Sequence, residues 1–152
     1  MMKRLVITWA LAVVLFGLAG VAEAVRPAEP AKPFVNVSTT PDKLDLGTVP
    51  LTGIYDIPAA VTVEVEANCV HGPIVVSTTT LKRRQGGSIL PERISVRTPA
   101  TGGFVTMAKP VAISEQTAGS HKIVVDLKVQ PDVRNLAGEY TGTFMFTVMP
   151  PS

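Results

Sequence analysis

Alternation of apolar and polar residues with a period of two runs through the chain and predicts β-strands. The clearest case is the stretch from residue 138 to residue 148. Because successive strand side chains point to opposite faces, one face of this stretch holds Tyr140, Gly142, Phe144, Phe146 and Val148. We expect this aromatic face to form the centre of the core, and the last strand to close the fold.

The same period recurs upstream. Val61–Cys69 alternates between small apolar residues and polar ones, as expected of an antiparallel strand with one wet face. Ile74–Arg84 and Ile89–Thr98 flank the turn sequence Gln85–Ser88 and predict one long hairpin. Shorter or weaker patterns predict further strands at 34–39, 44–49, 110–115 and 121–130.

Turn signals separate these seven or eight strands at intervals of roughly 8–12 residues, which is the spacing of a β-sandwich. Outside the first 24 residues, no segment has the sustained apolar period of a helix. The sequence therefore predicts an all-β protein, an immunoglobulin-like antiparallel β-sandwich of about seven or eight strands.

The N-terminus predicts export. Lys3 and Arg4 precede the apolar stretch Leu5–Val21, and Ala22-Glu23-Ala24 places small residues before a cleavage point. We therefore predict a cleaved signal peptide at 1–24, a proline-rich tether at 25–33 and the β-sandwich domain at 34–150. The alternative is an uncleaved membrane anchor, although the stretch is slightly short for a spanning helix, which needs about 20 apolar residues. The expected location is secreted, either periplasmic or extracellular and associated with the cell surface.

Charge and cysteine content narrow the class of protein. Without the predicted leader, 12 Lys and Arg residues face 11 Asp and Glu residues, so nothing favours a nucleic-acid partner. Cys69 is the only cysteine and excludes an internal disulfide. Its place in the alternating strand predicts a buried thiol, with an intermolecular disulfide as the alternative.

Two stretches resemble bacterial families. Pro41–Val49, followed by the alternating strand that reaches Asn68-Cys69, resembles the opening of bacterial secreted immunoglobulin-like domains. Ala137–Val148 is similar to the last strand of secreted pilin-like and spore-coat-like subunits. This second resemblance implies a terminal strand beside a groove or edge that a partner can occupy. The chain departs from chaperone–usher pilins because it lacks their disulfide and ends Met149-Pro150-Pro151-Ser152, without an aromatic residue.

Metal binding and catalysis have weak signals. Cys69, His71 and His121, with five methionines, are the ligand types of a copper site in a β-sandwich. A small periplasmic metal-binding protein would hold the three side chains within about 4 Å of a common point. Gly72-Pro73 ends the strand beside His71, however, so we expect neither a metal site nor a cofactor. Ser120 and His121 are adjacent and would point to opposite faces, and we expect no catalytic residues.

Two surfaces are candidates for partners. One is a basic patch for an anionic glycan, a lipid headgroup or an acidic protein, formed by Lys82, Arg83, Arg84, Arg93 and Arg97. Its alternative role is to protect a sheet edge from aggregation. The other is a strand-pairing edge on the polar face of the last strand, formed by Thr141, Thr143, Met145 and Thr147.

These patterns together predict a non-catalytic, secreted structural or protein-interaction module at the cell surface or in the periplasm. Its partner would be a protein, either another copy or another surface component, and only the signal peptide would meet the membrane. The oligomeric state is left open. A pilin-like subunit that assembles by strand exchange is the first alternative, and it predicts an open apolar groove and a mobile Phe34–Thr39 segment.

Overall fold

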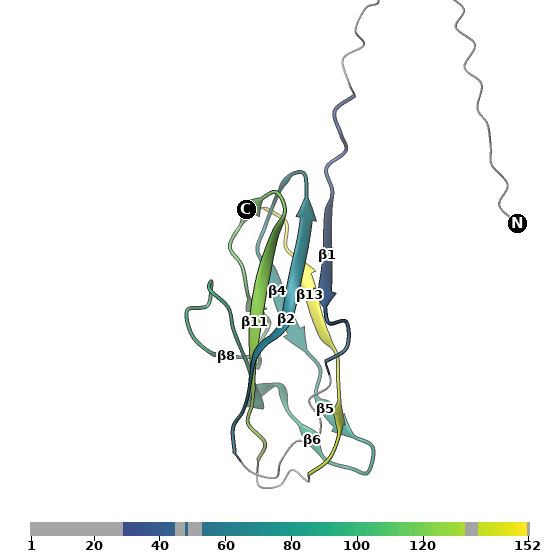
Figure 1. Ribbon diagram of the computed structural model, residues 1–152, viewed down its shortest axis with the longest axis vertical. Helices are drawn as coiled ribbons and strands as arrows, with labels where there is room; N and C mark the ends of the chain where they lie inside the picture. The colour runs from purple at the N-terminus through teal and green to yellow at the C-terminus, as the bar shows by residue number, and fades with distance from the viewer. Residues whose placement is uncertain (1–28, 45–47, 49–52, 133–136, 152) are drawn as a thin grey trace, which may run out of the picture. The chain divides into compact units, whose positions relative to one another are not determined.

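A computed structural model describes residues 29–44, 48, 53–132 and 137–151. These residues form an all-β protein of antiparallel sheets without an α-helix, as the alternating pattern predicts (Figure 1). The described residues from Lys32 onward form one compact unit. The predicted signal peptide and the first part of the tether lie outside the described residues. Within the described part, no helix is long and apolar enough to span a membrane.

The largest sheet has five strands. Their order across the sheet is β1 (Val35–Thr40), β2 (Tyr55–Ala67), β11 (His121–Val129), β7 (Ile94–Arg97) and β8 (Val105–Thr106). β2 and β11 are its long central pair, with a β-bulge between Val125 and Leu127. The alternation read from the sequence sets which residues face inward, so Val63 and Val65 are fully buried while Glu64 between them stays accessible.

Three smaller sheets complete the fold. One has the order β13 (Phe144–Val148), β4 (Ile74–Thr78) and β9 (Val111–Ala112), and a second has the order β12 (Tyr140–Thr141), β5 (Leu81–Arg83) and β6 (Ser88–Ile89). A two-stranded sheet pairs β10 (Thr117–Ala118) with β3 (Val70–His71). The first two are nearly continuous, because the Thr79 amide donates to the Thr143 carbonyl at 3.0 Å in the gap between them.

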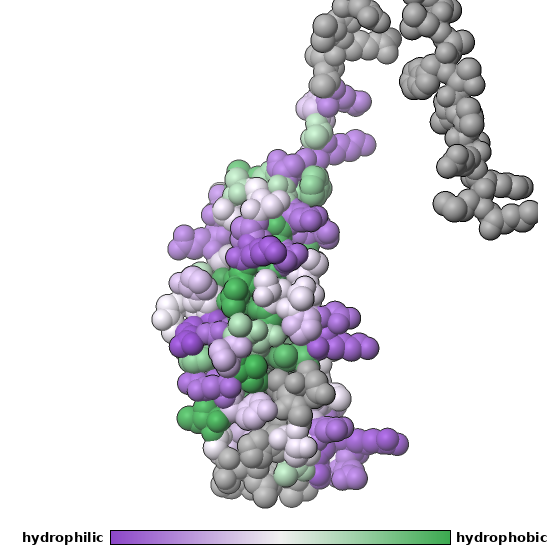
Figure 2. All heavy atoms as spheres, in the orientation of Figure 1, coloured by the Kyte–Doolittle hydropathy of each residue, from purple (hydrophilic) through white to green (hydrophobic). Residues whose placement is uncertain are grey.

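One hydrophobic core joins the five-stranded sheet to the smaller sheets. Its fully buried members come from β2, β4, β7 and β11 together with Ile89 and Ile113. Tyr140, Phe144 and Phe146 pack against this core but are only half-buried. The prediction that the aromatic face of the last strand forms the centre of the core is therefore wrong. Aliphatic residues fill the centre, and the aromatic residues flank it. Figure 2 shows hydrophobic atoms reaching the surface between hydrophilic side chains on the face in view.

The predicted long hairpin is also wrong in its second arm. β5 pairs with β6, which places Leu81 opposite Ile89, but the pairing stops there. A short 3₁₀ turn, η1 (Pro91–Arg93), then takes the chain across to the five-stranded sheet, where β7 pairs with β11. Pro91 has no amide to donate to a ladder, so the chain leaves the sheet at this proline.

Other predicted strands differ in extent. Phe34–Thr39 corresponds to β1, and 110–115 shortens to β9. The predicted strand 44–49 lies mostly outside the described residues. Cys69 is half-buried rather than buried, with its Sγ 3.6 Å from the Phe34 carbonyl oxygen.

Candidate protein-interaction edge

The last strand lies at the margin of its sheet. Among the described strands, β13 pairs with β4 and with no other, and β1 likewise pairs only with β2. The two edge strands contact each other across the gap between the sheets (Figure 1). Edge strands present unpaired main-chain groups that can accept another chain. The prediction that the last strand closes the fold is therefore wrong within the described residues.

A groove of about 360 Å³ opens beside these strands. Buried Val61 and Leu81 lie at its base, and half-buried Leu44, Phe144 and Phe146 line it. The rest of the lining consists of the residues of β12 and of Thr39, Pro41, Asp42, Lys43, Gly142 and Thr143. The groove thus exposes the flank of the hydrophobic core on the side where β1 and β13 end their sheets.

The ladder shows which groups of β13 are available. Thr79 donates to the Thr143 carbonyl and the Met149 amide donates to the Pro73 carbonyl, both at 3.0 Å. Hydrogen-bonded pairs alternate along an antiparallel ladder, so Met145 and Thr147 also direct their main-chain groups toward β4. The main-chain groups of Phe144, Phe146 and Val148 therefore point away from β4. We call this outer side of β13, from Phe144 to Val148, the open edge.

The structure thus refines the predicted strand-pairing edge. Three of the predicted residues, Thr143, Met145 and Thr147, are exposed on β13 or beside it, and Thr141 is exposed on β12. Their side chains cover the outer face of the sheet. The groups that can pair with a new strand instead belong to the intervening residues, whose side chains face the core.

The other margins of the fold are short. β8, β6 and β9 each contain two residues, whereas β13 contains five and β1 six. Short strands and charged residues are the usual protection of a sheet edge. The open edge has neither, because no charged residue occurs between Tyr140 and Ser152. β13 and β1 are therefore the two described margins that short length does not protect.

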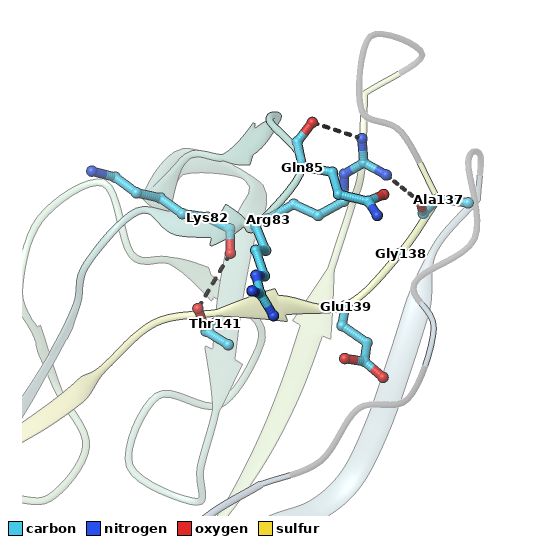
Figure 3. A pocket seen from close by; sticks show the side chains of 8 residues that line it. Lys82, Arg83, Gln85, Ala137, Gly138, Glu139 and Thr141 are labelled. Carbon is cyan, nitrogen blue, oxygen red and sulfur yellow. Dashed lines mark hydrogen bonds between the residues drawn. The ribbon is translucent and has the colours of Figure 1, made fainter.

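The predicted basic patch is divided between two sheets. Lys82, Arg83 and Arg84 belong to β5 and its turn, and they line a shallow pocket of about 520 Å³ (Figure 3). Arg83 donates to the carbonyl oxygens of Gly86, Ala137 and Gln85 at 2.7, 3.0 and 3.4 Å. Its guanidinium therefore organises the local backbone and has few donors left for a ligand. Lys82 and Arg84 stay exposed.

The two remaining basic residues, Arg93 at the end of η1 and Arg97 on β7, have acidic partners of their own. Arg93 forms an ion pair with Asp132 at 3.6 Å, and Arg97 donates through Nε and a terminal nitrogen to Asp126 Oδ2 at 2.9 and 2.7 Å. The Arg97 guanidinium and the Lys128 ammonium also lie 4.6 and 4.0 Å from the centre of the Phe104 ring. The five residues therefore do not form one patch.

Asp126 bonds both Arg97 and the main chain of β2, a role that the sequence pattern did not predict. Its other carboxylate oxygen accepts a hydrogen bond from the Ala59 amide at 2.7 Å, and Ala59 has a φ of 49°, which L-residues seldom adopt. The bond from Ala59, followed by that from Arg97, lowers the pKa of Asp126 below its ordinary value. The carboxylate fixes the bulged pairing of β11 with β2. The β-bulge and the positive φ depend on distant pairing, so no local sequence signal could have identified this role.

The metal-binding alternative required Cys69, His71 and His121 to lie together, and the structure brings only the two histidines together. His71 and His121 stack with ring centroids 5.3 Å apart and planes inclined by 8°. The buried Nε2 atoms of both rings find no hydrogen-bond partner within the part of the chain that the structure describes. Nearly parallel rings do not aim their in-plane lone pairs at one ion, and no group of three His, Cys, Asp or Glu side chains that could hold a metal occurs among the described residues. The arrangement therefore does not supply a ligand set.

Comparison with protein-family models, with curated proteins and with solved structures finds no match for this chain. The functional assignment therefore rests on the geometry of the open edge and its groove.

Proposed function

We propose that this protein is a non-catalytic, secreted structural or protein-interaction module that receives an extended strand from a partner at the open edge. The observation that carries the proposal is the combination of outward main-chain groups on Phe144, Phe146 and Val148 with the groove beside them, which has apolar residues at its base and polar residues at its rim. Strand addition uses these two features, since main-chain bonds give affinity and alternate side chains fill pockets. We place its action at the cell surface or in the periplasm, on the basis of the leader sequence.

The order of the described strands supports an immunoglobulin-like β-sandwich in which these strands leave one position empty. Immunoglobulin domains place strands A, B, E and D in one sheet and C, F and G in the other. The order β1–β2–β11–β7 fits the first sheet, with β4 and β13 as strands C and F. Strand G would then lie beside β13, at the open edge. A partner strand there would complete the second sheet.

A pilin-like subunit is the second candidate, favoured by the open groove that strand exchange requires. Two observations oppose a donor taken from the start of the chain. Val35–Thr40 is already paired with β2. The preceding tether contains Pro27, Pro30 and Pro33, which cannot donate main-chain hydrogen bonds. If strand exchange occurs, we therefore expect its donor to be a different segment.

Amide hydrogen exchange measured by NMR tests strand addition at single-residue resolution. In the dilute protein, the Phe144, Phe146 and Val148 amides should exchange quickly, and those of Met145 and Thr147 slowly. A peptide with the sequence of residues 140–149, with solubilising lysines at its ends, serves as the probe strand. We expect it to protect the three outward amides. If saturating peptide leaves their exchange unchanged, strand addition at this edge is refuted.

The proposed export has its own test. Expression of the full chain in a bacterium, followed by fractionation and intact-mass measurement, should give a periplasmic or extracellular product that begins at Val25. A product that keeps residues 1–24 in the cytoplasm would contradict the export part of the proposal and would leave the edge chemistry intact.

A further inference from the structure

The open edge also indicates which partner it fits. We infer that two copies of this chain pair through their β13 strands, antiparallel and about a twofold axis, to join the two sheets into one. This inference rests on the proposed function, since it names the partner of the same edge. Three independent features support it: the charge of the edge, its register and the side chains beside it.

Charge favours a second copy. Antiparallel pairing about a twofold axis brings each segment against itself, and like charges directly opposite each other are destabilising. Most edge strands avoid self-pairing by carrying such charges. The stretch from Tyr140 to Ser152 contains no Lys, Arg, Asp or Glu. Nothing in this stretch therefore repels an identical strand, and β8, β6 and β9 are too short to offer an equivalent ladder. The other long edge strand, β1, is uncharged as well, so the half-buried aromatic residues of β13 decide between the two edges.

Register follows from the direction of the main-chain groups. The outward groups belong to Phe144, Phe146 and Val148. Only with Phe146 on the twofold axis do all three residues pair, so that Phe144 lies opposite Val148 of the partner subunit and Phe146 opposite its own copy. Apolar residues then meet apolar residues on the inner face. Cross-strand aromatic and β-branched pairs of this kind stabilise antiparallel sheets.

The outer face is equally compatible with this register. Met145, whose side chain is 50% exposed, lies opposite Thr147 of the partner subunit. This pair is of the non-hydrogen-bonded type, in which facing side chains come closest. The partner's strand would also bury more of the half-buried side chains of Phe144 and Phe146, because it extends the sheet beside them.

Paired charges at the two exposed positions test the register. In the Met145→Lys/Thr147→Lys variant, lysines face lysines twice across the axis. In Met145→Glu/Thr147→Lys, each glutamate faces a lysine of the other copy. Sedimentation equilibrium should show a concentration-dependent dimer for the wild-type protein. The double-lysine variant should form a dimer that is weaker by a factor of about ten or more. The Glu/Lys variant should form the dimer again at low salt and lose it at high salt.

A matched control lies on the other long edge. Asn36 and Ser38 are exposed on β1, so Asn36→Lys/Ser38→Lys adds the same charge without touching β13. We expect its dimer to equal the wild type. Far-ultraviolet circular dichroism and thermal melting verify that all variants fold.

Three results would overturn the inference: a wild-type monomer at all concentrations, equal effects of the double-lysine and Glu/Lys variants, or a dimer dissociated by the β1 control. If the wild type is a monomer and the 140–149 peptide still protects the three outward amides, strand addition survives and only the second copy is refuted. If the peptide gives no protection either, both proposals fail.

Discussion

Removal of the Asp126 carboxylate should destabilise the protein more than removal of any exposed carboxylate. Asp126 holds the Ala59 amide at 2.7 Å and two nitrogens of Arg97 at 2.9 and 2.7 Å, and its side chain is 21% exposed. A hydrogen bond to a charged group contributes about 1.5–3 kcal/mol. The pair with half-exposed Arg97 adds at most about 1 kcal/mol. We therefore expect Asp126→Ala to lower the free energy of unfolding by about 2–3 kcal/mol.

The pH dependence of this effect follows from the lowered pKa of Asp126. A carboxyl group with a lower pKa in the folded state stabilises the fold above its unfolded-state pKa and loses that contribution as pH falls through the folded value. The difference between wild type and Asp126→Asn should therefore be constant near neutral pH. It should begin to shrink around the ordinary value of 3.8 and continue to shrink at lower pH.

Urea unfolding monitored by far-ultraviolet circular dichroism measures both effects. Tryptophan fluorescence is unsuitable, because the single tryptophan, Trp9, lies in the predicted leader. Asp56→Ala is the control, since Asp56 is 59% exposed and lies 3.8 Å from Lys128. Its effect should stay below about 1 kcal/mol. Two results would refute this role of Asp126. One is an equal loss of unfolding free energy in the two alanine variants, and the other is a difference in unfolding free energy between wild type and Asp126→Asn that is the same at pH 7 and pH 3.

Further substitutions test the packing around the open edge. Ile74→Ala removes a fully buried side chain of β4 and should lower the free energy of unfolding by about 2–5 kcal/mol. Ile54 is 57% exposed, so Ile54→Ala should change this free energy by no more than about 0.5 kcal/mol. Equal losses in chemical denaturation would contradict the assigned core. Gly142→Ala would press a Cβ against the buried leucine of β5, so we expect a loss of about 1–3 kcal/mol and a lower melting temperature. Gly72→Ala would place a Cβ against the carbonyl oxygens of Met149 and Pro150, so we expect the C-terminus to detach and carboxypeptidase to digest it faster than in the wild type. An unchanged digestion rate would mean that this contact does not hold the C-terminus.

The sequence predicted the class of fold because alternation acts locally. Along β11 and the second half of β2, the period of two identifies the residues that face the core. The prediction of Val61–Cys69 missed the first half of β2, which begins at Tyr55, and extended past its end at Ala67. The long-range arrangement left weaker traces. The crossing at Pro91 had a signal, since proline disfavours a ladder, but the sheet that β7 would join depends on its pairing with β11, which is distant in sequence.

The candidate site was predicted in outline and not in detail. The resemblance of Ala137–Val148 to terminal strands pointed to the segment that contains β13, which the structure shows at the margin of its sheet. The sequence analysis chose the residues whose side chains are polar, whereas the main-chain groups that point away from β4 belong to the residues between them. The direction of these groups alternates along a strand and depends on which neighbour β13 already has. The sequence analysis grouped basic residues that are close in sequence into one patch. The structure separates them, because η1, which ends at Arg93, leads the chain to the five-stranded sheet that contains Arg97.

The gap between β13 and β12 has a consequence for motion. The ladder narrows there to contacts around Thr79, which bonds Thr143 through both its amide and its hydroxyl at 3.0 Å. Beyond this point β12, β5 and β6 contribute only two or three residues each. Local opening is easiest where few buried contacts must break. Leu81 and Ile89 nevertheless anchor β5 and β6 in the core. The exposed turn that joins these two strands should therefore open first, while β4 and β13 stay paired, so the open edge keeps its shape during this motion.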